Sequence, residues 1–132
     1  MIRQTFWSRH AAAALLGAAG DLDTLEEIAQ EARQGLAQVW RVDTDEAQGW
    51  VVTRVEMRPD GPLELVVVLG AGHGARSIIP WFKHLAVSHD LPRIRTHIKR
   101  RGLRRLYERE GFRVDHEIDG HLVMVWADGQ QE

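Results

Sequence analysis

Residues 65–82, with the sequence LVVVLGAGHGARSIIPWF, decide the fold of this chain. They begin as an apolar run of β type, pass through Gly70, Gly72 and Gly74, and end in a segment with helical spacing. A glycine-rich turn between a strand and a helix lets main-chain N–H groups converge on an anion, and the start of the helix adds partial positive charge. The stretch therefore predicts a βαβ crossover that could hold a phosphate.

The composition indicates an ordinary soluble globular protein. The chain has 132 residues, 44% of them hydrophobic and 27% charged, and its formal net charge of -2 gives no global argument for nucleic-acid binding. Because it contains no cysteine, disulfides, thiolate metal sites and a cysteine nucleophile are excluded. The N-terminus lacks the pattern of a signal peptide, and the longest apolar run, residues 11–19, is too short to span a bilayer. We therefore expect a cytoplasmic protein without membrane association.

Hydrophobic periodicity predicts a single domain over residues 1–127 and a disordered tail over 128–132. The stretch Asp21-Leu22-Asp23-Thr24 offers N-caps for the second helix, and Thr24 with Glu27 forms a capping-box pattern. Residues 1–7 could be a short strand or a frayed end. Helices are expected over 10–19, 25–38, from the glycine turn to about 87, and over 101–110; strands are expected near 39–42, 50–57, 63–69, 93–98, 112–118 and 121–126. The order is that of a mixed α/β or α+β fold with one central crossover.

Two tight turns and one proline refine this order. Arg58–Pro62 is a strong turn that predicts an antiparallel hairpin, and Asp119-Gly120 has the signature of a type I′ hairpin turn. Pro80 fits within the first turn of a helix that Ser77 caps, whereas a helix that starts at Gly74 should bend at Pro80.

Two interpretations of the glycines follow from the residues alone. Residues 70–75, GAGHGA, satisfy the dinucleotide fingerprint G-x-G-x-x-G/A, but the next strand ends in basic residues where a ribose-binding acid is needed. In the second interpretation the glycines only permit a tight turn and close packing. A third interpretation depends on the sequence downstream.

Residues 100–112, RRGLRRLYEREGF, resemble the segment of the GNAT superfamily N-acetyltransferases in which a short helix ends in a leucine, a tyrosine, a charged pair, a glycine and a phenylalanine. The glycine turn also resembles the acetyl-CoA pyrophosphate loop of that family, with Gly72-His73-Gly74 as its G-x-G. Two positions depart from the family pattern. Leu69 stands in place of an arginine or glutamine, and Arg100 in place of an asparagine.

The resemblance implies a mostly antiparallel central sheet of six to seven strands, with helices on both faces. It implies an acyltransferase that moves an acetyl group from acetyl-CoA, a co-substrate, to an amine. The alternative is a catalytically silent domain with the same fold that serves in binding or structure. The resemblance places the coenzyme on residues 69–77, of which we single out Leu69, Gly70, Gly72, His73, Gly74, Ala75, Arg76 and Ser77.

The same resemblance assigns the catalytic groups. Tyr107, the one tyrosine of the chain, stands where the family tyrosine protonates the departing thiolate. Glu64 is the first candidate for the base that takes a proton from the amine, with Glu56 as the alternative, although a water relay is also open. A main-chain N–H near Leu69 or Gly70 would stabilise the oxyanion. Each residue also has a non-catalytic interpretation. Tyr107 could simply pack its ring under the sheet, and Glu64 and Glu56 could be solvated glutamates on strands.

Partners other than the coenzyme are less defined. The histidines have no metal-ligand spacing, so we expect no metal. A basic cluster could contact coenzyme A, an acidic acceptor or, with less support, nucleic acid, or it could be a solvated surface; its members are Arg93, Arg95, Lys99, Arg100, Arg101, Arg104 and Arg105. The sequence identifies no acceptor amine, and a homodimer is expected only from the family resemblance.

Overall fold

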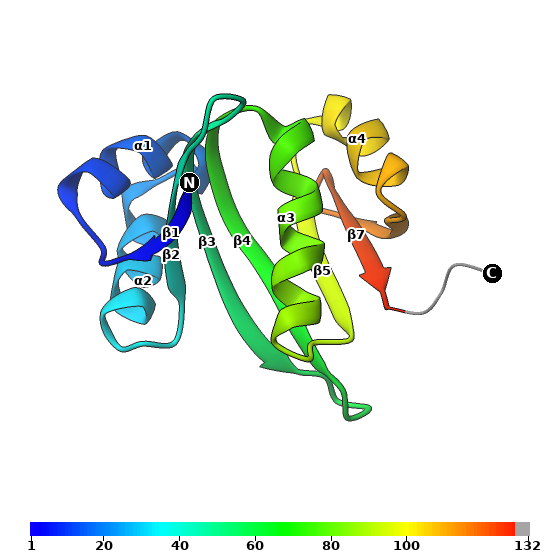
Figure 1. Ribbon diagram of the computed structural model, residues 1–132. Coiled ribbons are helices and arrows are strands. Elements are labelled where there is room, and N and C mark those ends of the chain that lie inside the picture. The colour runs from blue at the N-terminus through cyan, green and yellow to red at the C-terminus, as the bar shows by residue number, and fades with distance from the viewer. Residues whose placement is uncertain (129–132) are drawn as a thin grey trace. The chain divides into compact units, whose positions relative to one another are not determined.

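The structure is a computed structural model, and it describes residues 1–128 (Figure 1). The predicted order of strands and helices is confirmed. In chain order the elements are β1 (Ile2–Thr5), α1 (Arg9–Ala19), α2 (Leu22–Arg33), β2 (Gln38–Asp43), β3 (Gln48–Met57), β4 (Leu63–His73), α3 (Ala75–Ser88), β5 (Arg93–Ile98), the 3-10 helix η1 (Arg101–Leu103), α4 (Arg104–Arg109), β6 (Arg113–Ile118) and β7 (His121–Ala127).

The strands form one sheet of seven strands in the order β1-β2-β3-β4-β5-β7-β6. The pairs β1–β2, β2–β3, β5–β7 and β6–β7 are antiparallel. Helix α3 joins β4 to β5, its neighbour in the sheet, which confirms the central crossover. None of the helices within residues 1–128 has the length and hydrophobicity that crossing a bilayer requires.

The chain divides into two compact units. Unit 1 comprises residues 1–55 and 67–74, and unit 2 comprises residues 56–66 and the chain from Ala75 onward. Residues 129–132, which make up most of the predicted tail, lie outside the described residues. Asp128, the first residue of that tail, donates its main-chain N–H to the Pro92 carbonyl at 2.8 Å.

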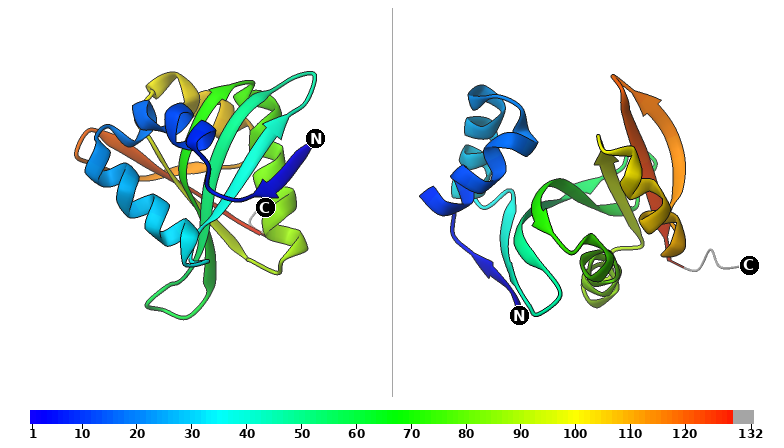
Figure 2. Two further views of the ribbon diagram at one scale, coloured as in Figure 1. Left: turned by 90° about the vertical axis from the view of Figure 1, so that its left-hand side faces the viewer. Right: turned by 90° about the horizontal axis from the view of Figure 1, so that it is seen from above.

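Unit 1 packs the helix pair α1–α2 around an apolar core (Figure 2). Each helix begins at a residue whose side chain accepts a main-chain N–H: Ser8 from Ala11 for α1, and Asp21 from Thr24 for α2. Asp21, one of the N-cap candidates in residues 21–24, is thus the cap, and Thr24 of the capping-box pattern lies inside the helix. The core cluster consists of Ala11, Leu15, Ala19, Leu25, Ile28, Ala37, Val39 and Val52.

Helix α2 is shorter than its sequence pattern predicts. It ends at Arg33 instead of Gln38. Gly35 follows with φ of 79°, a left-handed conformation that ends helices at little steric cost, and Leu36 remains 61% exposed. Val39, which fits the helical period, instead belongs to β2.

In unit 2, helix α3 lies along β5 and contacts α4 (Figure 1). The two faces of β5 differ because side chains alternate along a strand. Ile94, Thr96 and Ile98 are buried, whereas Arg93 and Arg95 are half-buried on the opposite face. The tail hairpin β6–β7 turns at Asp119 and Gly120, whose φ values of 50° and 78° agree with the predicted type I′ turn. A β-bulge interrupts the pairing of β6 between Val114 and His116.

Candidate functional site

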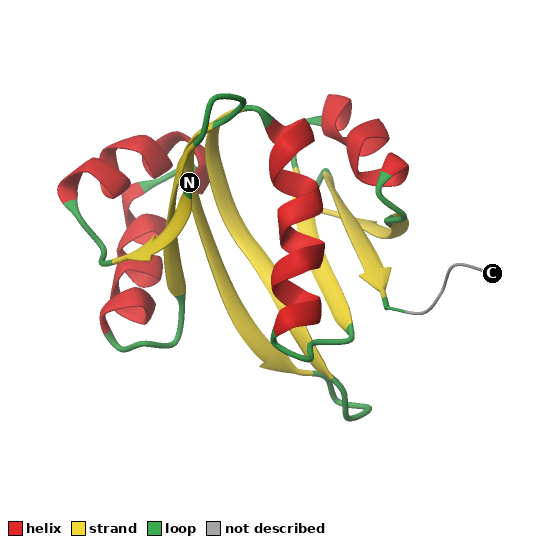
Figure 3. Ribbon diagram, in the orientation of Figure 1, coloured by secondary structure: helices red, strands yellow, loops and turns green. Residues whose placement is uncertain are grey.

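The glycine segment is part of a strand and not a separate turn. Strand β4 was predicted to end at Leu69, but it continues to His73, so Gly70 and Gly72 lie within it. Gly74 alone separates β4 from α3, as the short connection between them shows (Figure 3). Helix α3 therefore begins at Ala75, before Ser77, and Pro80 lies inside it. Pro80 has no N–H to donate to the main chain one turn earlier.

Two of the glycines are explained by close packing within unit 1. A Cβ on Gly72 would lie 2.0 Å from the Gln48 carbonyl oxygen, and a Cβ on Gly74 would lie 2.4 Å from that of Glu46. Their φ values of 131° and 92° also disfavour other residues. The segment 46–49 thus presses against the end of β4, and the packing interpretation accounts for Gly72 and Gly74.

Gly70 differs from the other two. Its φ is not positive, and an added Cβ would meet only the Trp50 carbonyl oxygen, at 3.9 Å. Packing therefore does not require glycine there, and Gly70 and His73 are exposed. Leu69, by contrast, packs its side chain against the apolar core of unit 1. Only the main chain of Leu69 is left to contact a ligand.

The first turn of α3 carries the remaining residues of the candidate coenzyme segment. No acidic residue lies in this turn, so nothing there opposes the partial positive charge at the start of the helix. Arg76 is exposed, while Ala75 and Ser77 are half-buried.

Tyr107 is buried in unit 2, with 6% of its surface exposed. Its ring packs edge-on against Phe112 at 5.0 Å between centroids, and its hydroxyl is hydrogen-bonded to the side chain of Thr96. Burial raises the pKa of Tyr107, and the Thr96 hydrogen bond opposes that shift. The phenol is therefore protonated at neutral pH and able to donate a proton.

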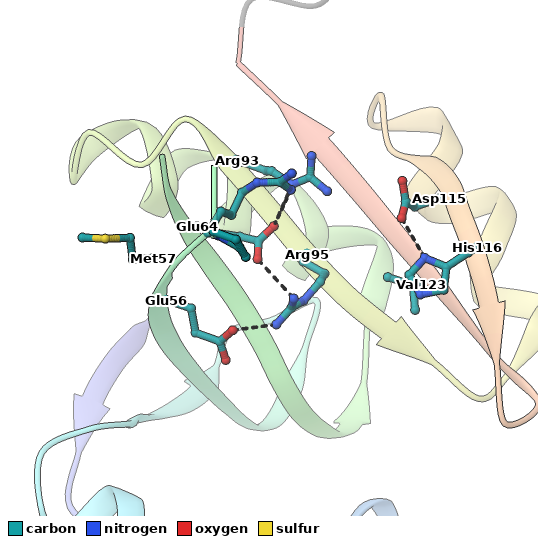
Figure 4. A pocket seen from close by; sticks show the side chains of 10 residues that line it. Glu56, Met57, Glu64, Arg93, Arg95, Asp115, His116 and Val123 are labelled. Atoms are coloured by element: carbon teal, nitrogen blue, oxygen red, sulfur yellow. Dashed lines mark hydrogen bonds and ion pairs between the residues drawn. The ribbon is translucent and has the colours of Figure 1, made fainter. Parts of the chain in front are cut away.

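Glu64 is the centre of an ion-pair network in unit 2 (Figure 4). Its side chain is 2% exposed. Oε2 lies 2.6 Å from Arg93 Nε and 3.6 Å from Arg58 Nη1, and Oε1 lies 3.4 Å from Arg95 Nη1. Glu56, the alternative base, accepts from Arg95 Nη2 at 2.8 Å. Both candidate bases thus belong to one network of guanidinium groups.

This network borders a pocket of about 300 Å³ within unit 2. Its lining residues come from the end of β3, the following turn, the start of β4, β5, β6 and β7, and they are Glu56, Met57, Arg58, Pro59, Glu64, Arg93, Arg95, Asp115, His116 and Val123. Asp115 and His116 form a pair at 2.7 Å on one side, which lowers the pKa of Asp115. Sequence analysis placed Arg93 and Arg95 in a basic cluster with several possible roles, whereas the structure places both against the buried carboxylate of Glu64.

Arg58, Arg93 and Arg95 were not predicted as a site. Two sequence features could have indicated the network. Arg93 and Arg95 lie on the same face of β5, and Glu56 and Glu64 lie on either side of the turn 58–62. A cluster of three His, Cys, Asp or Glu side chains able to hold a metal is not found within residues 1–128. On η1 and α4, Arg101 pairs with Glu117 and Arg104 with Glu108.

Comparison with known proteins gives a match at the level of structure only. No family model matches the sequence, and no curated protein matches it either. A Bacillus subtilis acetyltransferase solved in complex with CoA superposes with a TM-score of 0.70 at 14% identity, over 96% of this chain and 97% of that one.

Two further solved structures agree. A GNAT family acetyltransferase from Elizabethkingia anophelis with acetyl-CoA bound gives a TM-score of 0.70 at 11% identity, over 96% of this chain and 97% of that one. A Campylobacter jejuni N-acetyltransferase in complex with acetyl coenzyme A gives 0.62 at 11% identity, over 97% and 99%. The chain has the GNAT fold over nearly its whole length.

Proposed function

We propose that this chain binds acetyl-CoA and transfers the acetyl group to an amine. The observation that carries the proposal is the match over 96% of the chain to acetyltransferase structures that hold CoA or acetyl-CoA. The end of β4, Gly74 and the first turn of α3 supply the physical basis, because together they combine exposed residues with the start of a helix.

We assign the coenzyme pyrophosphate to the contiguous segment 69–77. The main-chain N–H groups of Gly70, Gly72, His73 and Gly74, and those of Ala75, Arg76 and Ser77 at the start of α3, are the proposed donors. Gly70 is the informative position, since packing does not explain its missing side chain. The exposed guanidinium of Arg76 would add a charge-assisted contact. Leu69 contributes only main chain, because its side chain packs into the unit 1 core.

In the proposed reaction the amine nitrogen attacks the thioester carbonyl, a C–N bond forms and the C–S bond breaks. A main-chain N–H at Leu69 or Gly70 stabilises the oxyanion of the tetrahedral intermediate. Tyr107 donates its proton to the departing thiolate; burial raises its pKa, which keeps the phenol protonated before the reaction but lowers the driving force of this donation. Thr96 would orient the phenol through their hydrogen bond.

The proposed reaction also needs a base, for which the chain offers two carboxylates. We retain Glu64, with Glu56 as the alternative, to take a proton from the substrate ammonium so that the neutral amine can attack. Glu64 can accept the proton only if one of its guanidinium contacts opens, since Arg93 and Arg58 hold one oxygen and Arg95 the other. A water molecule that relays the proton to this network would meet the same need.

Titration calorimetry with acetyl-CoA tests the coenzyme site. We expect micromolar binding, on the order of 8 kcal/mol in free energy, that Gly70→Val weakens about tenfold by blocking the main chain without changing the melting temperature. Gly102→Val is the matched control, because an added Cβ meets no atom within 4 Å at Gly102 and only the Trp50 carbonyl oxygen, at 3.9 Å, at Gly70. If wild-type protein does not bind acetyl-CoA, the catalytically silent alternative is correct.

Release of free thiol from acetyl-CoA with a panel of amines tests the chemistry. Tyr107→Phe should lower turnover by about a hundredfold, as expected for loss of a general acid, while acetyl-CoA affinity stays constant. Unchanged turnover would remove Tyr107 from the mechanism.

A further inference from the structure

The pocket in unit 2 is lined mainly by charged side chains. Within residues 1–128, none of its lining residues lies on a helix. Arg93 and Arg95 project from the face of β5 opposite to Ile94 and Thr96, which are buried on the other face. Glu64 lies beneath both guanidinium groups, and Asp115 and His116 stand across the pocket (Figure 4).

The guanidinium groups offer more donors than the carboxylates use. Arg93 contacts Glu64 through Nε, and no acceptor for its two terminal nitrogens is found within residues 1–128. An arginine carries about five N–H donors, so about four of those on Arg93 remain for a ligand. The Arg93 side chain is 20% exposed. Its guanidinium is therefore bound by Glu64 on one side and accessible from the pocket on the other.

Arg95 gives an independent indication of a missing partner. Its Nε is buried and has no hydrogen-bond partner, the one such side-chain atom found in the described part of the chain. Buried donors in native proteins are nearly always satisfied by protein, water or ligand. Arg95 lines the pocket, but its Nε is itself covered, so a ligand oxygen held there would satisfy this N–H only after the Arg95 side chain turns toward the pocket.

Charge and shape together indicate a carboxylate. The planar guanidinium fork matches a carboxylate in bidentate geometry. A phosphate would bring close to two negative charges beside Glu56, Glu64 and Asp115, whereas a carboxylate brings one. Glu56 and Asp115 are in turn placed to accept from an ammonium group, and Met57 and Val123 add apolar surface.

We propose that this pocket binds a small aliphatic amino carboxylate, with its carboxylate on Arg93 and Arg95 and its ammonium toward Glu56 and Asp115. The binding itself is independent of any catalysis. That the ligand is the acceptor amine rests on the function proposed above, and in this pose the ammonium faces Glu56, the alternative base, and not Glu64. A pocket of about 300 Å³ is at the small end of ligand sites and suits a single amino acid.

The probes for this site are L-leucine, its amide leucinamide, and isocaproate, which keeps the carboxylate and lacks the amine. Binding is measured by titration calorimetry on the full chain without acetyl-CoA. We expect leucine to bind best, isocaproate more weakly, and leucinamide at least about tenfold more weakly than leucine, since a neutral amide loses the charge-assisted contacts. Equal binding of leucine and leucinamide, stronger binding of inorganic phosphate, or no binding of leucine and isocaproate would each overturn the proposal.

Variants separate recognition from folding. Arg93→Lys keeps a positive charge beside Glu64 but loses the bidentate fork, so leucine affinity should fall about tenfold with the melting temperature nearly unchanged. Arg113→Lys, at an exposed position on β6 outside the pocket, is the matched control. If Arg93→Lys and Arg113→Lys bind leucine equally, Arg93 is not a ligand.

Calorimetry with acetyl-CoA distinguishes this inference from the proposed function. Binding of acetyl-CoA without binding of leucine leaves the proposed function intact and refutes the pocket assignment. Binding of leucine without acetyl-CoA supports the pocket and refutes the acyltransferase.

Discussion

The two units of this protein are stabilised in opposite ways. Unit 1 has a core of small and aliphatic side chains under α1 and α2, and it brings main chains together where Gly49, Gly72 and Gly74 allow it. Unit 2 also has an apolar core, but it buries Glu64 and surrounds it with three arginines. Apolar packing stabilises without a specific ligand, whereas a buried ion-pair network gains little net stability over apolar residues. The network of unit 2 is therefore weak evidence of a folding role, and its residues line the pocket for which we propose a ligand.

The largest effect should come from filling the glycine contact of unit 1. Gly72→Ala would place a Cβ 2.0 Å from the Gln48 carbonyl oxygen at a φ of 131°. We expect a loss of about 3 kcal/mol or more in the free energy of unfolding, measured with urea, because both main chains must shift.

Gly17→Ala is the matched control in unit 1, since an added Cβ there meets no atom within 4 Å and Gly17 lies inside α1. It should stabilise by roughly 0.5 kcal/mol. Equal stability of the two variants would mean that the strands of unit 1 are not held in close approach.

Removing the buried charge of unit 2 should have the next largest effect. Glu64→Gln leaves three guanidinium groups without their shared carboxylate and should cost about 2 kcal/mol, less than for a fully buried pair because the arginines are partly solvated. Glu117→Gln, which breaks the exposed pair with Arg101, should cost less than about 0.5 kcal/mol. A Glu64→Gln protein as stable as wild type would show that the network is a surface feature in solution.

The smallest effect concerns Tyr107 and appears mainly at alkaline pH. Burial raises the pKa of Tyr107, so the folded chain keeps this proton at pH values where the unfolded chain has lost it. The free energy of unfolding should therefore fall as pH rises above about 10, the ordinary pKa of tyrosine.

Tyr107→Phe keeps the ring contact with Phe112 but loses the hydrogen bond to Thr96, which should cost about 1 kcal/mol in the free energy of unfolding at neutral pH. The variant should also lose most of the decrease in the free energy of unfolding at alkaline pH. Parallel pH profiles for the two proteins would contradict the buried position of the phenol.

Most of the fold could be predicted because local signals agree with it. Strand β5 was predicted with its observed bounds, and the Asp119-Gly120 turn with its observed conformation, since each depends on neighbours in sequence. The errors occurred where residues distant in sequence determine the local structure. The glycines at the end of β4 lie in close contact with residues 46–49, and no local pattern carries that information.

The candidate site was predictable in part for the same reason. The segment 69–77 and Tyr107 were predicted as site residues because motifs of contiguous residues carried the resemblance, and their roles stay predictions. The network around Glu64 was missed, because its partners Arg93 and Arg95 are distant in sequence and alternate with apolar residues in a basic stretch. Charge content alone could not distinguish solvated arginines from arginines paired with a buried carboxylate.

The β-bulge in β6 bears on how this protein behaves at high concentration. β6 is the last strand in the sheet order, and its pairing shifts between Val114 and His116. Bulges and charged side chains on a rim strand disturb the regular row of main-chain donors and acceptors to which a second chain would add. Arg113, Asp115 and Glu117 place charges along this rim, so growth of fibrils by strand addition is disfavoured there.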